Sequence, residues 1–156
     1  RFEPRAEELA KKYALAPYTM FIGSGALGGE TILFSMCILE EMQWKRTRYI
    51  TSADFFHGTL ELVEPGVPVF LFMGEDENRK LDERVRAFLT RGVTGDTDIN
   101  IIDTAEFAIP GLDDEFRVIV SPWILTVLVT DRLARYYETV TKHNLKYRRY
   151  YHQFDY

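Results

Sequence analysis

Two side chains able to move protons lie sixteen residues apart in the segment 41–58, EMQWKRTRYITSADFFHG. Glu41 follows an apolar segment expected to be helical, and His57 follows the next short strand. A carboxylate and an imidazole are the usual pair for moving protons on and off carbon and oxygen. Their spacing is too long for one helix face, so we expect them to converge on one substrate only if both lie at the same end of a parallel sheet. The alternatives are an exposed acid at a helix end and a histidine packed beside two phenylalanines.

Short apolar runs that alternate with helical segments predict such a sheet and an α/β fold. Five strands are expected, at residues 18–22, 48–52, 67–74, 98–103 and 116–120. Helices are expected at residues 5–14, 29–44 and 77–92. A last, long helix is expected to begin with Ser121 as its N-cap and Pro122 at its first position. In sheets of this kind, ligands bind beyond the carboxyl ends of the strands.

Composition restricts the class of protein. The 156 residues fit one domain, and 46% hydrophobic with 28% charged residues is typical of a soluble globular protein. A net charge of −5 argues against nucleic acid as the main partner, and no apolar run is long enough for a membrane span. The single Cys37 excludes an internal disulfide, and its apolar neighbours predict a buried thiol. With no secretory signal visible, a cytoplasmic protein is expected; the start at Arg1 suggests a piece of a longer or processed chain.

Three segments could contact a ligand. The glycine-rich turn at 23–29, GSGALGG, could cradle a phosphate with backbone N–H groups and a helix end, or be a tight structural turn. The hydroxyls of Thr51 and Ser52 could bind phosphate or sugar oxygens, or cap the next turn. The arginine- and tyrosine-rich tail could bind nucleic acid or pack as an arm across the domain or onto a second subunit, and the acidic total favours the arm. No spacing of histidine and cysteine suits a metal.

The segments ILEEMQW, SADFFHG and RRYYHQFDY together resemble the sugar isomerase (SIS) domain proteins. Within that family they are similar to the second SIS half of the fructosamine 6-phosphate deglycases, over about residues 18–156. The resemblance implies a three-layer, flavodoxin-like sandwich with a central five-stranded parallel sheet. It also implies that residues 1–156 form a single SIS domain, the C-terminal half of a two-SIS protein, with 142–156 as a C-terminal arm.

The activity implied by this resemblance is breakdown of a ketoamine 6-phosphate to glucose 6-phosphate and a free amine or amino acid, without a cofactor and in a homodimer. The isomerase part of glucosamine-6-phosphate synthase has a glutamate and a histidine at the same separation. By resemblance, Glu41 would shuttle a proton between C1 and C2. His57 would act as an acid on the sugar ring oxygen, including from across a dimer interface. The substrate-binding candidates are three hydroxyl residues in the place of the family's phosphate loop and an arginine of the tail: Ser24, Thr51, Ser52 and Arg149.

The chain departs from the family pattern in ways that leave alternatives open. Asp54 stands in place of a glutamate and Thr59 in place of a proline around the histidine. The main phosphate loop of the family belongs to the first SIS half, which is not in this chain. A phosphosugar aldose–ketose isomerase would use the same base and acid, and a non-catalytic phosphosugar-binding or dimerisation module would need neither. The region of Tyr150, where the synthase type has a lysine, favours the deglycase.

Overall fold

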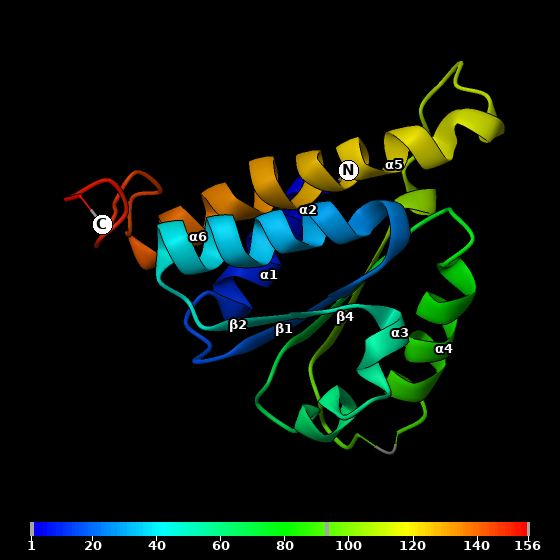
Figure 1. Cartoon of the computed structure of the whole chain (residues 1–156), viewed down its shortest axis with the longest axis horizontal. Coiled ribbons are helices and arrows are strands. Elements are labelled where there is room, and N and C mark those ends of the chain that lie inside the picture. The colour runs from blue at the N-terminus through cyan, green and yellow to red at the C-terminus, as the bar shows by residue number, and fades with distance from the viewer. Residues whose placement is uncertain (1, 93, 156) are drawn as a thin grey trace.

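The computed structural model describes residues 2–92 and 94–155. Its centre is a sheet of four parallel strands in the order β2–β1–β3–β4. The strands are β1 (Thr19–Gly23), β2 (Thr47–Ile50), β3 (Val69–Met73) and β4 (Ile99–Asp103). Because all four run the same way, their carboxyl ends share one edge of the sheet, the carboxyl edge, and their starts share the opposite, amino edge (Figure 1).

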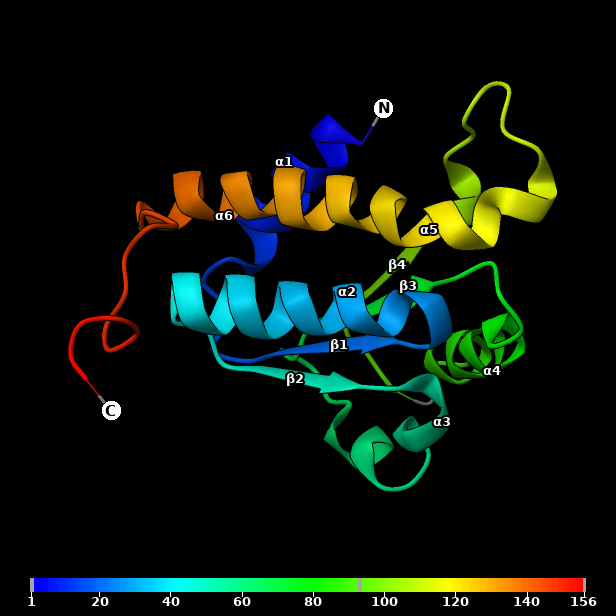
Figure 2. The same cartoon turned by 45° about the horizontal axis from the view of Figure 1, so that its top comes forward.

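Alternating side chains of the strands divide the interior into two cores. Phe21, Phe70 and Phe72 belong to one core cluster, whereas Met20 and Leu71 belong to the other. The first is covered by α1 (Glu3–Tyr13), by α2 (Gly28–Ile32) with the wider π-helical turns η2 (Leu33–Met42), and by α5 (Arg117–Leu125), η6 (Thr126–Leu133) and α6 (Ala134–Thr141). The second is covered by α3 (Ser52–Phe55) and α4 (Arg79–Leu89). The molecule is therefore a three-layer α/β sandwich (Figure 2).

The expected fifth strand at 116–120 is wrong, because this segment begins the long helix α5–η6–α6. A short apolar run satisfies a buried strand and a helix equally well. Here Ile119 is 69% exposed, which a central strand would not allow. The helix consequently contains Ser121 and Pro122 in its interior and does not begin at them. Ser121 Oγ donates a hydrogen bond of 3.1 Å to the carbonyl of Val118, the group that Pro122 has no N–H to bond.

The helix after β1 carries the chain back from the carboxyl edge to the amino edge. Its fifteen residues, Gly28 to Met42, span roughly 20 Å. It ends at Trp44, which has a left-handed φ of 53° where glycine is the usual residue. There the amide of Lys45 donates to the carbonyl of Leu39 at 2.8 Å, which closes the helix end. Strand β2 then returns to the carboxyl edge, so the end of η2 and the start of α3 lie at opposite edges (Figure 2).

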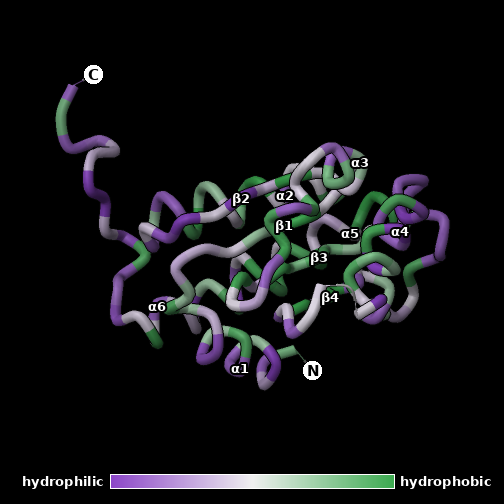
Figure 3. The backbone as a smooth tube through the Cα atoms, turned by 90° about the horizontal axis from the view of Figure 1, so that it is seen from below, coloured by the Kyte–Doolittle hydropathy of each residue, from purple (hydrophilic) through white to green (hydrophobic). Residues whose placement is uncertain are grey.

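The remaining features concern the surface. No helix in the described part of the chain is both long and apolar enough to cross a bilayer. Cys37 is a free, half-buried thiol, so the expectation of a fully buried one is wrong. After α6, the C-terminal segment leaves the body of the sandwich, and most of its residues are hydrophilic (Figure 3).

Candidate functional site

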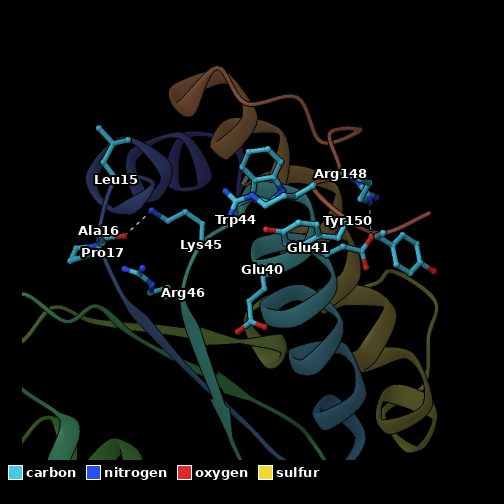
Figure 4. A pocket seen from close by; sticks show the side chains of 12 residues that line it. Leu15, Ala16, Pro17, Glu40, Glu41, Trp44, Lys45, Arg46, Arg148 and Tyr150 are labelled. Carbon is cyan, nitrogen blue, oxygen red and sulfur yellow. Dashed lines mark hydrogen bonds and ion pairs between the residues drawn. The ribbon is translucent and has the colours of Figure 1, made fainter. Parts of the chain in front are cut away.

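A large cavity in the described part of the chain lies at the amino edge, at the end of η2. It has a volume of about 780 Å³. Three segments form its wall: the turn after α1, the end of η2 with the residues that follow it, and the C-terminal arm (Figure 4). Its lining residues are Leu15, Ala16, Pro17, Glu40, Glu41, Trp44, Lys45, Arg46, Arg148, Arg149, Tyr150 and Tyr151.

Glu41, the candidate base, is held in the wall of this cavity by the C-terminal arm. Arg148 Nε lies 2.8 Å from Glu41 Oε1, and the two side chains are 18% and 31% exposed, respectively. The same guanidinium donates from Nη1 to the carbonyls of Leu145 and Tyr147, at 2.8 and 2.9 Å. Because Arg148 is tied to the arm's own backbone, the ion pair fixes the carboxylate while leaving it partly open to the cavity.

A second contact fastens the arm beside this ion pair. The guanidinium carbon of Arg149 lies 4.3 Å from the centroid of the Trp44 ring, a cation–π contact. The ring of His143 packs edge-on against Trp44 with centroids 4.3 Å apart, and the carbonyl of His143 accepts a 2.6 Å hydrogen bond from Gln43 Nε2. The left-handed residue at the end of the helix is thus the platform on which the arm rests.

The cavity is cationic although the whole chain is acidic. Four cationic and two anionic side chains line it, an excess of two positive charges, in a chain of net charge −5. Lys45 Nζ donates to the carbonyl of Ala16 at 2.7 Å, and burial lowers the pKa of Lys45. Such a local field raises the concentration of anions at the cavity. The arrangement is therefore suited to a negatively charged ligand next to the Glu41 carboxylate.

His57 lies away from this cavity. It follows α3 at the carboxyl edge and is exposed, whereas Glu41 is at the amino edge, one helix length away. The condition set by the sequence, that both lie at one end of the sheet, is not met within a single chain. The signal that could have shown this was helix length: fifteen helical residues between two parallel strands must end at the opposite edge from where they began.

Ser24 and Ser52 do meet at the carboxyl edge, as their positions after strands predict. The amide of Ser52 donates to Ser24 Oγ at 2.6 Å, and Ser52 Oγ donates to Asp82 Oδ1 at 2.5 Å. The second carboxylate oxygen of Asp82 accepts from the amide of Gly74 at 3.2 Å. All three polar side chains are at most 5% exposed, so this is a buried network that joins β1, α3 and α4. Burial raises the pKa of Asp82.

Thr51 caps the short helix α3. Its hydroxyl accepts from the amide of Asp54 at 3.0 Å and donates to the Asp54 carboxylate at 2.7 Å. Asp54, a departure from the family pattern, is therefore engaged in a local cap. Of the four substrate-binding candidates, only Arg149 lines the cavity that contains Glu41.

The glycine-rich turn holds an anion that belongs to the chain itself. The amide of Ala26 donates to Asp76 Oδ2 at 2.5 Å, and Gly25 has a φ of 54°. A side chain at Gly25 would meet the same carboxylate oxygen at 2.2 Å. The carboxylate takes the position that a phosphate would need, which favours the structural alternative for this turn.

No cluster of three or more metal-ligating side chains is found among residues 2–92 and 94–155.

Three cavity residues are not candidates on sequence grounds. Trp44 and Arg46 carry no motif of their own, and Arg148 belongs to the tail expected to pack as an arm. The available signal was the polar turn KRTR directly after the helix, together with the paired arginines of the tail. Their proximity depends on a contact between segments about one hundred residues apart, which local patterns do not reveal.

No family model matches the chain. The fructosamine deglycase of Bacillus subtilis (strain 168) is 30% identical over 148 residues, which cover 93% of this chain and 43% of that protein. The fructoselysine 6-phosphate deglycase of Escherichia coli (strain K12) is 29% identical over 153 residues, 96% of this chain and 42% of that protein. The chain therefore spans less than half the length of these relatives.

Solved structures show the same relation. A structure from Bacillus subtilis described as a phosphosugar isomerase matches with a TM-score of 0.89 and 28% identity over 99% of this chain and 46% of that chain. A structure from Salmonella typhimurium LT2 with the same description matches with a TM-score of 0.88 and 29% identity, over the same shares. Across almost its whole length, the chain is thus a homologue of part of the fructosamine and fructoselysine 6-phosphate deglycases, which are enzymes, and it has the SIS fold of the phosphosugar isomerases.

Proposed function

We propose that this chain is one half of an enzyme that cleaves a fructosamine 6-phosphate to glucose 6-phosphate and a free amine or amino acid. The observation that carries the proposal is the place of Glu41: the carboxylate expected to move the proton lies in the wall of the cationic cavity at the amino edge. The relatives support this substrate class, because they are a fructosamine deglycase and a fructoselysine 6-phosphate deglycase.

The proposed chemistry needs one base and one water molecule. With the sugar ring open, Glu41 takes a proton from C1, which is activated by the neighbouring C2 carbonyl, and an enolamine forms. Return of the proton to C2 gives an imine between C1 and the amine nitrogen. Water adds to this imine, the C1–N bond breaks, and glucose 6-phosphate and the amine leave. The overall reaction consumes one water molecule and involves no net oxidation or reduction.

His57 is proposed to reach the sugar from a second copy of the chain, in a homodimer. The topology supports this, since Glu41 and His57 of one copy are at opposite edges of the sheet. An unpartnered apolar face gives further support: α5 and η6 expose Ile119, Trp123 and Val127, at 69%, 71% and 48%. Large exposed apolar side chains at a spacing of four residues on a helix are typical of an interface.

The proposed location of the protein is the cytoplasm.

A phosphorus NMR time course tests the reaction. The protein is incubated with fructoselysine 6-phosphate in one tube and with fructose 6-phosphate in another. Glucose 6-phosphate growing only in the first tube would establish the deglycase. Glu41→Gln should abolish this signal because the amide cannot accept the proton, and Glu40→Gln, a change at the neighbouring cavity residue, is the matched control. Normal turnover by Glu41→Gln would refute the assignment of the base.

The second candidate is an aldose–ketose isomerase of a phosphosugar. Structural neighbours described as phosphosugar isomerases favour it, and the same proton transfer between C1 and C2 would serve. Interconversion of glucose 6-phosphate and fructose 6-phosphate in the second tube would identify this activity. Binding of either sugar without product in either tube would identify the third alternative, a non-catalytic module.

A further inference from the structure

Two arginines next to each other in the arm have different roles in the cavity wall. Arg148 is engaged by the Glu41 carboxylate and by two carbonyls of the arm. Arg149 stacks on Trp44, and within the described residues its guanidinium forms no ion pair and donates no hydrogen bond. Both line the cavity of Glu41, and the close-up shows the helix end beneath the arm (Figure 4).

Stacking prepares a guanidinium for binding an anion. The ring of Trp44 covers one face of the Arg149 group and limits its rotation, while the N–H groups at the edge of the plane stay available. A planar fork of this kind matches the two oxygens of a carboxylate or phosphate. The Trp44 ring is itself packed against the ring of His143, which supports the platform.

We propose that Arg149, positioned by Trp44, binds a terminal oxyanion of the substrate while Glu41 faces its reacting carbons. The inference rests on the proposed function and adds which residue holds the anion and what orients that residue. A ketoamine 6-phosphate carrying an amino acid has two such groups, the sugar phosphate and the carboxylate of the amine. Their shared chemistry is an oxyanion on a flexible chain extending from the reacting carbons.

The excess positive charge of the cavity agrees with such a ligand. Lys45 donates a hydrogen bond to the carbonyl of Ala16, and Arg148 forms an ion pair with Glu41. Neither cation has to leave its partner when the anion binds. Of the two arm arginines that line the cavity, Arg149 is the one that can accept the ligand without losing an ion pair to another described residue. Its interaction with Trp44 is retained on binding, because stacking uses the face of the guanidinium and the anion uses its edge.

Calorimetric titration of the protein with three ligands tests the proposal: fructoselysine 6-phosphate, the same compound without its phosphate, and the 6-phosphate of the adduct with cadaverine, which lacks the carboxylate. Arg149→Met keeps the apolar stem and removes the guanidinium. It should weaken binding of fructoselysine 6-phosphate roughly tenfold, as expected for one charge-assisted hydrogen-bonded contact. The matched control is Arg84→Met, because Arg84 stacks at 4.0 Å on Phe56 outside the cavity; its affinity should equal that of the wild type.

The three ligands identify the anion. If Arg149 binds the phosphate, Arg149→Met and the wild type should bind the ligand without phosphate with equal affinity. If Arg149 binds the carboxylate, the two proteins should bind the cadaverine adduct with equal affinity. Trp44→Leu should reproduce part of the loss and Trp44→Phe should restore binding, since phenylalanine still offers a stacking face. In the assay for turnover, these changes should raise KM more than they lower kcat.

Equal affinity of the wild type and Arg149→Met for all three ligands would overturn the inference and leave the proposed function standing. Absence of both binding and turnover in the folded wild-type protein that contains both halves would instead remove the proposed function and this inference with it. Loss of affinity in Arg84→Met as large as in Arg149→Met would also overturn the proposal, because the effect would then be a general one of charge.

Discussion

At the scale of residues, burial separates the polar groups with a structural role from the polar groups that stay open to the cavity. Ser24, Ser52 and Asp82 satisfy one another inside the protein, so their hydroxyls and carboxylate are not offered to solvent. Glu41 and Arg149 differ in being partly exposed at a cavity. Ser24, Ser52 and Arg149 are all substrate-binding candidates by the family resemblance, and only burial distinguishes the two serines from the arginine.

The hydroxyl of Tyr137 offers a direct test of polar burial. The side chain is 1% exposed, and its hydroxyl finds no hydrogen-bond partner among the described residues. Tyr137→Phe removes an unpaired polar group and keeps the packed ring, so the free energy of unfolding should rise by about 1 kcal/mol in urea titrations. The neighbouring Tyr136→Phe is the control, because its hydroxyl lies 2.9 Å from Glu3 Oε2 at the surface. A decrease in stability for Tyr137→Phe would contradict the assignment of an unpaired group.

Asp82 predicts a pH dependence of stability. Burial raises its folded-state pKa above the ordinary value of 3.8, so the folded protein holds this proton more tightly than the unfolded chain. Stability from Asp82 is therefore present below pH 3.8 and is lost as pH rises through the folded-state pKa. Wild type and Asp82→Asn are compared by their free energies of unfolding. Above pH 3.8, the value for the wild type minus the value for the variant should fall as the pH rises. A difference that rises or stays constant would rule this out; the exposed Asp113→Asn is the control for losing a carboxylate.

At the scale of elements, the Ser-Pro pair shows how one sequence signal can have two structural meanings. Ser121 followed by Pro122 is typical of a helix start, yet the pair lies inside α5. Pro122 leaves the Val118 carbonyl without its usual N–H, and the Ser121 hydroxyl supplies the missing donor at 3.1 Å. The helix can therefore begin earlier, at Arg117, and the apolar run before the pair becomes helical.

A double-mutant cycle tests this compensation. Ser121→Ala should cost about 1 kcal/mol of unfolding free energy in the wild type, because the Val118 carbonyl loses its donor. In the Pro122→Ala background the same change should cost less, since the amide of residue 122 then bonds that carbonyl. Thermal unfolding of the four proteins gives the coupling. Equal costs in both backgrounds would show that the hydroxyl does not replace the proline's missing bond.

At the scale of the whole molecule, the parallel topology decides which residues can cooperate. A helix that joins two parallel neighbours returns the chain to the amino edge, and the second strand brings it to the carboxyl edge again. Glu41 and His57 are separated by this path. Two copies related by a two-fold axis would place Glu41 of each beside His57 of the other, if both act on one substrate.

Mixing two inactive variants tests this arrangement. Glu41→Gln and His57→Ala should each be inactive, whereas subunit exchange between them should restore about one quarter of the wild-type turnover, because half of the dimers are mixed and each mixed dimer has one intact site. The glucose 6-phosphate signal in phosphorus NMR provides the measurement. A mixture that exchanges subunits but stays inactive would show that both residues of one site come from the same copy.

Local patterns are enough to predict the α/β class, the four strands, the helices between them and the resemblance to SIS proteins. These features depend on local periodicity, on glycine-rich turns and on short motifs such as ILEEMQW and SADFFHG. Three other features become visible only in the folded chain: 116–120 is helical, Glu41 and His57 lie at opposite edges, and the arm brings Arg148 and Arg149 to the end of η2. These depend on packing between distant segments, because an apolar run satisfies strand and helix alike until its neighbours set which side chains are buried.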